Sequence, residues 1–253
     1  MGIGLYVIGD EILSGRRQDQ HFAKVRALLQ ERGLRLDWMM VLGDDRARLI
    51  EAFRHSFAQT DIVFSCGGIG VTPDDHTRQA AASALGVQCV IHPEAEQEIR
   101  ASIQARWARD PTPEQLQLGA FPQGARIIPN SFNRIPGFSC GDHHFVPGFP
   151  EMAWPMIVWV LDTHYAQLQH QQPYTEASIL LFNAVESEWV GFMEATQQRF
   201  GVSVFSLPCV GGEGRRRHIE LGAKGSPDAV ALAMQSMRDE AVKRNAEWAE
   251  QDE

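Results

Sequence analysis

Two glycine turns that carry carboxylates are the part of this sequence best suited to chemistry. The longer one, Gly67 to Thr77 (GGIGVTPDDHT), lies between an apolar strand expected at residues 61–66 and a helix expected at residues 78–85. Glycine lets the main chain approach a bound group, and the free N–H groups at a helix start attract phosphate. The carboxylates of Asp74 and Asp75 repel phosphate unless a divalent cation lies between carboxylate and phosphate. The turn therefore predicts a site for a phosphorylated small molecule together with Mg2+ or a similar ion.

The second turn, Gly9 to Gly15 (GDEILSG), follows an apolar strand expected at residues 3–8. The carboxyl ends of neighbouring strands meet at one edge of an open α/β sheet, so we expect both turns to share one crevice there. The alternative is an ordinary tight connection from strand to helix, in which Asp75 or Thr77 serves only as the helix N-cap. Asp44 has a similar ambiguity, because it either caps a helix beginning near Arg46 or faces the crevice.

Together the two turns resemble the molybdopterin-binding domain family, which includes CinA-type proteins, MogA/MoaB, MoeA and the N-terminal part of eukaryotic FAD synthases. CinA-type domains carry G-D-E-[IL]-L-x-G near their start and G-G-[LI]-G-x-T-P-D-D-x-T further along, and this chain reproduces both. Further matches follow in the same order: residues 41–45 (VLGDD), 122–125 (PQGA), Asn130, 136–138 (PGF) and 146–152 (VPGFPEM). The resemblance covers residues 3–165 and is closest to the CinA type.

The resemblance implies roles for two parts of the crevice. It aligns Asp75 with a catalytic or metal-linked aspartate, and it matches residues 147–150 to a P-G-x-P ligand loop. Asp10, Asp44 and Asp75 are the expected metal ligands. The expected ligand-binding residues are Gly9, Asp10, Glu11, Gly67, Gly68, Gly70, Thr72, Asp74, Thr77, Pro147 and Gly148. Molybdopterin is a possible ligand.

This chain departs from the family pattern in two places. Residues 114–119 (EQLQLG) lack the basic residue that the family carries before its P-x-G-A turn, and residues 133–137 (NRIPG) replace its G-T-A-P-G. Arg134 is a possible substitute cation. We therefore expect ligand binding to persist while turnover is lost or altered.

Composition excludes several classes of protein. The net charge is −9 without an extended Lys/Arg stripe, which argues against binding to nucleic acid or to membranes. No signal peptide and no long apolar run is visible, so a cytoplasmic protein is expected. The four cysteines lie far apart and indicate neither zinc nor disulfides. Neighbouring His143 and His144 should point to opposite faces of a strand, so they are not expected to share a metal ion.

The order of expected elements predicts two domains. Residues 1–166 alternate strands and helices and predict a three-layer, doubly wound α/β domain of MogA-like type. Residues 167–173 (QLQHQQP) form a polar linker, and residues 174–253 predict a smaller ferredoxin-like α+β domain of βαββα order. CinA proteins also carry a C-terminal amidohydrolase domain; this chain is expected to lack it, and deamidation of nicotinamide nucleotides is not expected.

Three functions stay open from the sequence. The first is a binding or processing module for an anionic pterin or nucleotide. The second is an enzyme, a metal-dependent pyrophosphatase of the ADP-ribose type, and the third is a non-catalytic scaffold. Whether the protein is an enzyme is not decided. The aromatic side chains Trp154 and Trp159 on the helix expected at residues 150–165, together with the resemblance, predict a homodimer or homotrimer.

Overall fold

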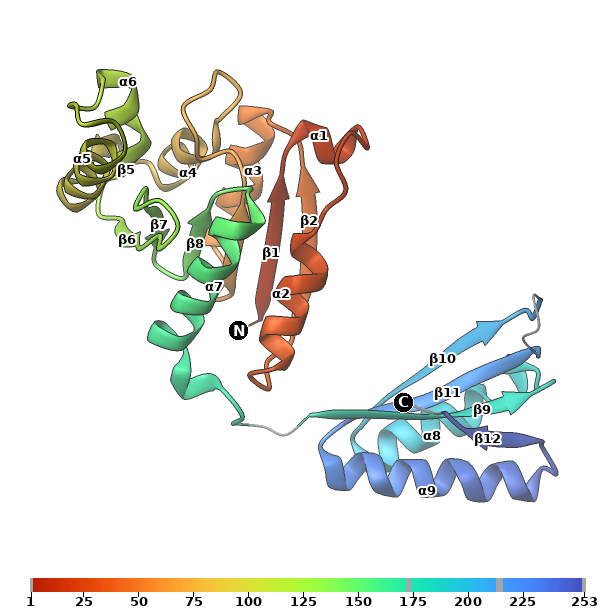
Figure 1. Cartoon of the computed structure of the whole chain (residues 1–253). Coiled ribbons are helices and arrows are strands. Elements are labelled where there is room, and N and C mark those ends of the chain that lie inside the picture. Colours follow the sequence, from red (N-terminus) through yellow and green to blue (C-terminus); the bar gives the residue numbers. More distant parts are fainter. Residues whose placement is uncertain (1, 172–173, 213–215, 252–253) are drawn as a thin grey trace. The chain divides into compact units, whose positions relative to one another are not determined.

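A computed structural model describes residues 2–171, 174–212 and 216–251 of the chain. The chain divides into two compact units, residues 1–169 and 170–253 (Figure 1). The linker predicted at residues 167–173 spans this division, and its residues 172–173 lie outside the described residues. The domain boundaries 1–166 and 174–253 stay a prediction. Among the described residues, no helix combines the length and the apolarity needed to cross a bilayer.

The first unit is built around a six-stranded mixed sheet of order β2-β1-β3-β8-β7-β6. The first four strands run parallel, and β7 is antiparallel to both of its neighbours. A separate two-stranded sheet pairs β4 with β5. The strands are β1 (Ile3–Ile8), β2 (Trp38–Leu42), β3 (Ile62–Cys66), β4 (Cys89–Ile91), β5 (Ala120–Pro122), β6 (Arg126–Ile128), β7 (Gly137–Cys140) and β8 (His143–Val146).

Helices cover both faces of this sheet, which makes the predicted three layers (Figure 1). Successive side chains of a strand point to opposite faces, so Leu5 and Val7 of β1 pack with α2 and α7 while Tyr6 and Ile8 pack with α3 and α4. The helices are α1 (Asp10–Leu13), α2 (His21–Gln30), α3 (Arg46–Phe57), α4 (Thr77–Leu85), α5 (Pro93–Trp107), α6 (Pro113–Leu116) and α7 (Pro150–His164).

The second unit is a four-stranded antiparallel sheet with two helices. Its strand order, β10-β11-β9-β12, together with the element order βαββαβ, is the ferredoxin-like arrangement. The core lies between the sheet and the helices and includes Ile179, Leu221 and Met237. The elements are β9 (Thr175–Phe182), α8 (Val190–Phe200), β10 (Ser203–Cys209), β11 (His218–Gly225), α9 (Pro227–Lys243) and β12 (Trp248–Glu250).

The predicted βαββα order is wrong at its last element. The sequence favoured a helix continuing to about Trp248, but α9 ends at Lys243 and the chain turns at Asn245, whose φ is +52°. Residues 248–250 then pair with β9 as the short strand β12. The edge of β9 would otherwise be exposed, so its unpaired main-chain groups favour a fourth strand there.

Candidate functional site

A cavity of about 470 Å3 lies where the four parallel strands end. Gly9 follows β1, Asp44 follows β2 after one residue, Gly67 follows β3, and Pro147 follows β8. Residue pairing at the ends of these strands is level, with Ile8 opposite Leu42, Val7 opposite Cys66, and Cys66 opposite Val146. The two predicted glycine turns therefore meet in one crevice at the carboxyl edge of the sheet.

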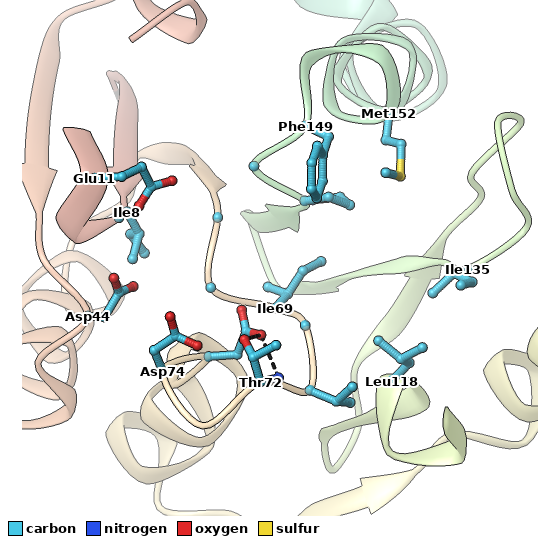
Figure 2. A pocket seen from close by; sticks show the side chains of 18 of the residues that line it. Ile8, Glu11, Asp44, Ile69, Thr72, Asp74, Leu118, Ile135, Phe149 and Met152 are labelled. Carbon is cyan, nitrogen blue, oxygen red and sulfur yellow. Dashed lines mark hydrogen bonds between the residues drawn. The ribbon is translucent and has the colours of Figure 1, made fainter. Parts of the chain in front are cut away.

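The cavity has an acidic end and an apolar end. Figure 2 shows the carboxylates of Glu11, Asp44 and Asp74 gathered on one side, with Ile69 in the middle. Side chains from distant segments bound the other side: Leu118, Ile135, Phe149 and Met152. A pocket of this size and character suits a small molecule with a flat apolar part and a polar part.

Glycine is required at two positions of the longer turn. Gly67 has φ +110°, and a Cβ atom there would overlap the carbonyl oxygen of Ile8. Gly68 has φ +67°, and its Cβ would overlap the Thr77 hydroxyl. Thr77 is fully buried, and its Oγ1 donates to the Gly67 carbonyl at 3.0 Å. Thr77 therefore holds the turn from behind and does not line the cavity, although it was expected to contact the ligand.

Asp75 braces the turn. Its Oδ2 accepts hydrogen bonds from the Thr72 N–H at 2.8 Å and from the Thr72 hydroxyl at 2.5 Å. The residue that precedes α4 is His76, and it makes no side-chain cap. The alternative that Asp75 or Thr77 is the N-cap is therefore wrong. Asp75 does line the cavity, but one of its oxygens is already committed to Thr72.

Asp10 and Asp44 are bound to each other's main chain. Asp44 Oδ2 accepts from the Asp10 N–H at 2.8 Å, and Asp10 Oδ1 accepts from the Asp44 N–H at 3.3 Å. The cap of α3 is the next residue, Asp45, so Asp44 belongs to the crevice instead. Burial raises the pKa of Asp44, and the nearby charges of Asp10, Glu11 and Asp74 raise it further. Asp10 itself does not line the cavity.

The predicted metal ligands Asp10, Asp44 and Asp75 do not form a closed cage. Among the described residues, no three His, Cys, Asp or Glu side chains are grouped as metal ligands. Mg2+ is commonly held by one or two carboxylates plus phosphate oxygens of the ligand. The residues present fit that arrangement, with Glu11, Asp44 and Asp74 as the carboxylates at the acidic end, and they do not fit an ion held by the protein alone.

Two buried side chains outside the cavity hold its glycine turns in place. The guanidinium of Arg78, which is 2% exposed, donates to the carbonyls of Gly70, Gln117 and Ala120. Burial lowers the pKa of Arg78. His21 lies within hydrogen-bonding distance of the Gly148 carbonyl, with its Nε2 at 3.1 Å. Arg78 thus fixes the turn after β3 to the segment after α6, and His21 fixes the turn after β8.

The loop at residues 130–136 shapes the apolar end. Asn130 Oδ1 accepts from the Phe132 N–H at 3.0 Å, and Asn133 Oδ1 accepts from the Ile135 N–H at 2.9 Å, so two Asx-turns follow each other. Arg134 was expected as a substitute cation for the ligand. It does not line the cavity and instead pairs with Glu98 at 2.8 Å.

The structure brings most of the predicted site residues together and adds others. Gly9, Glu11, Gly67, Gly68, Gly70, Thr72, Asp74, Pro147 and Gly148 line the cavity, as do Asp44 and Asp75. Sequence reasoning missed Arg17, the only Lys or Arg among the lining residues. It also missed the apolar side chains at the apolar end of the cavity. Leu118 and Ile135 lie within the two segments where the chain departs from the family pattern, which is the signal that could have found them.

His143 and His144 point to opposite faces of the sheet, as predicted. His143 Nε2 lies 2.9 Å from the Ser56 hydroxyl on one face of the sheet, and His144 bonds with Ser139 and Tyr165 on the other. Burial lowers the pKa of His143 to about 4 and that of His144 to about 3. Both imidazoles are therefore neutral parts of the core.

Comparison with known proteins identifies relatives of the first unit. A family model described as "Probable molybdopterin binding domain" matches residues 4–167. A protein of Pyrobaculum arsenaticum is 35% identical over 147 residues, covering 56% of this chain and 55% of that protein. A CinA-like protein of Desulforapulum autotrophicum is 32% identical over 199 residues, covering 74% of this chain and 47% of that protein. The chain thus spans about half the length of these relatives.

A solved structure agrees with this match. The crystal structure of the protein CinA with unknown function from Thermoplasma acidophilum aligns with a TM-score of 0.56 and 26% sequence identity. The alignment covers 64% of this chain and 98% of that one.

Proposed function

The chain belongs to the molybdopterin-binding domain family, and from that premise we propose that its cavity binds an anionic pterin or nucleotide. The flat heterocycle lies at the apolar end among Leu118, Ile135, Phe149 and Met152. The phosphate lies toward the glycine turns, whose main-chain N–H groups suit an anion. Arg17, which is exposed at the cavity wall, adds one positive charge.

The observation that carries this proposal is the two-ended cavity itself. Apolar side chains gather at one end and glycine turns with carboxylates at the other, and all of them belong to one space of about 470 Å3. A purely structural connection needs the turns but has no use for an open apolar end beside them. An exposed Phe149 ring, 54% exposed and lining the cavity, is a surface on which a heterocycle can stack.

A thermal-shift and calorimetry panel tests the proposal. Molybdopterin precursors, ADP-ribose, FAD, NAD and coenzyme A are each titrated with Mg2+, Mn2+, Co2+ or a chelator, and a true ligand raises the melting temperature. Phe149→Ala should weaken binding several-fold. Phe132→Ala is the matched control, because Phe132 is 64% exposed and does not line the cavity. If no compound in the panel binds, the proposal is wrong.

A second function is favoured by the acidic end. Glu11, Asp44 and Asp74 face the space where a phosphate would lie, so an anionic ligand needs a cation there. Asp44 and Asp74 would hold a divalent ion jointly with the ligand, and the ion would neutralise the phosphate charge. Such a site could hydrolyse a pyrophosphate of the ADP-ribose type. If AMP is released from ADP-ribose only when metal is present, the protein is a metal-dependent pyrophosphatase. If ADP-ribose binds but is not hydrolysed, the protein is a binding module.

Self-association and location are further proposals. We propose a homodimer or homotrimer in the cytoplasm. Trp154 and Trp159 are half-buried against the core of the first unit, so they give less free aromatic surface than expected. Trp159 also lines a second cavity of about 410 Å3 beside Pro155. Light scattering that gives a monomer at micromolar concentration would contradict the assembly.

The non-catalytic scaffold is the third candidate function. It is the one that remains if the folded protein binds none of the compounds in the panel.

A further inference from the structure

We propose that Asn133 recognises the ring of the ligand by donating a hydrogen bond from its Nδ2 to an acceptor on the ring edge. The inference rests on the proposed function, and it names a specificity-determining residue for the apolar end. Asn133 lies in a segment where this chain departs from the family pattern, with NRIPG in place of G-T-A-P-G. It is half-buried and lines the cavity together with Ile135 and Met152.

The orientation of the Asn133 amide is fixed by the loop. Its Oδ1 accepts from the Ile135 N–H at 2.9 Å, so its Nδ2 must point the other way. Its main-chain carbonyl accepts from the Ser102 hydroxyl at 2.6 Å, which anchors the residue to α5. The amide group is therefore held in place before any ligand arrives.

The donor that remains has only a weak partner. Asn133 Nδ2 donates to the Met152 sulfur at 3.3 Å, and a thioether is a poor hydrogen-bond acceptor. Met152 is flexible and lines the same end of the cavity. A ring nitrogen or ring carbonyl of a ligand would be a far better acceptor. The other amide of the loop differs, because Asn130 Nδ2 already donates one of its two hydrogens to a strong acceptor, the Ile135 carbonyl, at 3.0 Å.

The ligand class that follows is a flat heterocycle with a hydrogen-bond acceptor on its edge. Adenine and pterin rings both carry such acceptors. The hydrogen bond would form within an apolar surrounding, where an unpaired donor is costly, so a ring that offers Nδ2 no acceptor should bind less well. Asn133 thereby favours ligands that carry a flat heterocycle over sugar phosphates that lack one.

The test uses three probes, which would occupy the apolar end of the cavity, the phosphate end, or both. 6-Hydroxymethylpterin is a flat heterocycle without phosphate, ribose 5-phosphate is a sugar phosphate without a flat heterocycle, and AMP has both. Asn133→Ser is the main variant, because a serine hydroxyl can still accept from the Ile135 N–H in the turn but is too short to replace Nδ2. Asn133→Asp is the second variant; it keeps the acceptor and the shape, and replaces the donor by an oxygen.

We expect Asn133→Ser to weaken binding of the pterin or of AMP by about fivefold to tenfold, the effect of losing one hydrogen bond, and to leave ribose 5-phosphate unchanged. Asn133→Asp should weaken the same ring probes and, through its added charge, ribose 5-phosphate as well. The ring that responds shows whether the site reads adenine or pterin.

Two results would overturn the inference while leaving the proposed function intact. One is ring binding that both variants leave unchanged, which would mean that the donor is not used. The other is an equal loss for all three probes in Asn133→Ser with a lower melting temperature, which would mean that Asn133 only holds the loop. If the wild-type protein binds only ribose 5-phosphate, recognition of a ring by Asn133 is excluded, and phosphate binding at the glycine turns is still supported. If it binds no probe, the proposed function fails, and this inference fails with it.

Discussion

Asp10 and Asp44 each accept a hydrogen bond from the main-chain N–H of the other, at 3.3 and 2.8 Å. The two residues follow neighbouring parallel strands, so this exchange joins the ends of β1 and β2. It also keeps two carboxylates close together beside a third and a fourth, Glu11 and Asp74. Burial raises the pKa of Asp44, and these neighbouring charges raise it further. The acidic end of the cavity is thus held by main-chain hydrogen bonds against its own repulsion.

Asp44→Asn should stabilise the ligand-free protein at pH 7. Because the pKa of Asp44 is raised on folding, the folded state binds more protons, and stability falls as pH rises above the unfolded pKa of about 3.9. Asparagine keeps an acceptor for the Asp10 N–H and removes the charge. We expect a gain of at most about 1 kcal/mol after solvent screening, absent near pH 3. Denaturant titration at both pH values measures it, with Asp45→Asn as the neighbouring control; equal gains in both variants would contradict the assignment.

Asp75→Asn and Thr72→Val should both loosen the turn after β3. Each removes part of the bonding between the Asp75 carboxylate and Thr72, at a cost of about 1 kcal/mol in the free energy of unfolding. If Asp75 acts only as a brace, both variants weaken ligand binding by a similar factor at every metal concentration. If Asp75 also holds a metal, only Asp75→Asn changes the metal dependence. Calorimetry across a Mg2+ series distinguishes the two outcomes.

Alanine at two glycines that touch each other should have opposite results. Gly67 has φ +110° and its Cβ would overlap the Ile8 carbonyl, so Gly67→Ala should cost several kcal/mol or prevent folding. Gly148 has ordinary backbone angles, and its Cβ would lie 3.4 Å from the Gly67 Cα, a normal contact. Gly148→Ala should therefore fold normally and differ only in ligand binding. Melting curves compare them, and a destabilised Gly148→Ala would contradict the geometry.

Arg78→Lys should lower both stability and ligand affinity. Lysine keeps the charge but cannot reach the carbonyls of Gly70, Gln117 and Ala120 together, so buried acceptors lose their donors. We expect a loss of roughly 2 to 3 kcal/mol in unfolding free energy. Exposed Arg48→Lys is the control. Ligand affinity measured at a temperature where both variants are folded should fall only for Arg78→Lys; unchanged affinity would show that Gly70 needs no support.

Acid should destabilise the protein through His143 and His144. Their pKa values fall to about 4 and about 3 on folding, so below pH 6.5 the unfolded state binds more protons. The contribution of the neutral histidines to the free energy of unfolding is fully present above pH 6.5 and is lost as the pH falls toward 4. His143 alone accounts for a loss on the order of 3 kcal/mol. Denaturation at pH 7 and pH 4.5 measures the loss. His143→Gln should reduce it, and exposed His55→Gln is the matched control; an equal effect of both would contradict this origin.

The sequence predicted what local pattern determines. Apolar runs located the strands at residues 3–8 and 62–66, and the glycine turns marked where the crevice opens, because strand ends and tight turns depend on neighbouring residues. The strand β12 was missed because its three residues form a strand only against the edge of β9. Asn133, Leu118 and Met152 were missed because they come from distant segments that only the folded chain brings to one cavity.

Tyr165 gives the first unit a mechanical anchor. Its hydroxyl donates to Asp142 at 2.7 Å and lies 2.7 Å from His144 Nε2, just where α7 ends. Any tension on the chain beyond residue 169 must pass through this point before it reaches α7. The two short bonds join the end of α7 to the start of β8. The cavity lies at the other end of β8, where Pro147 follows the strand.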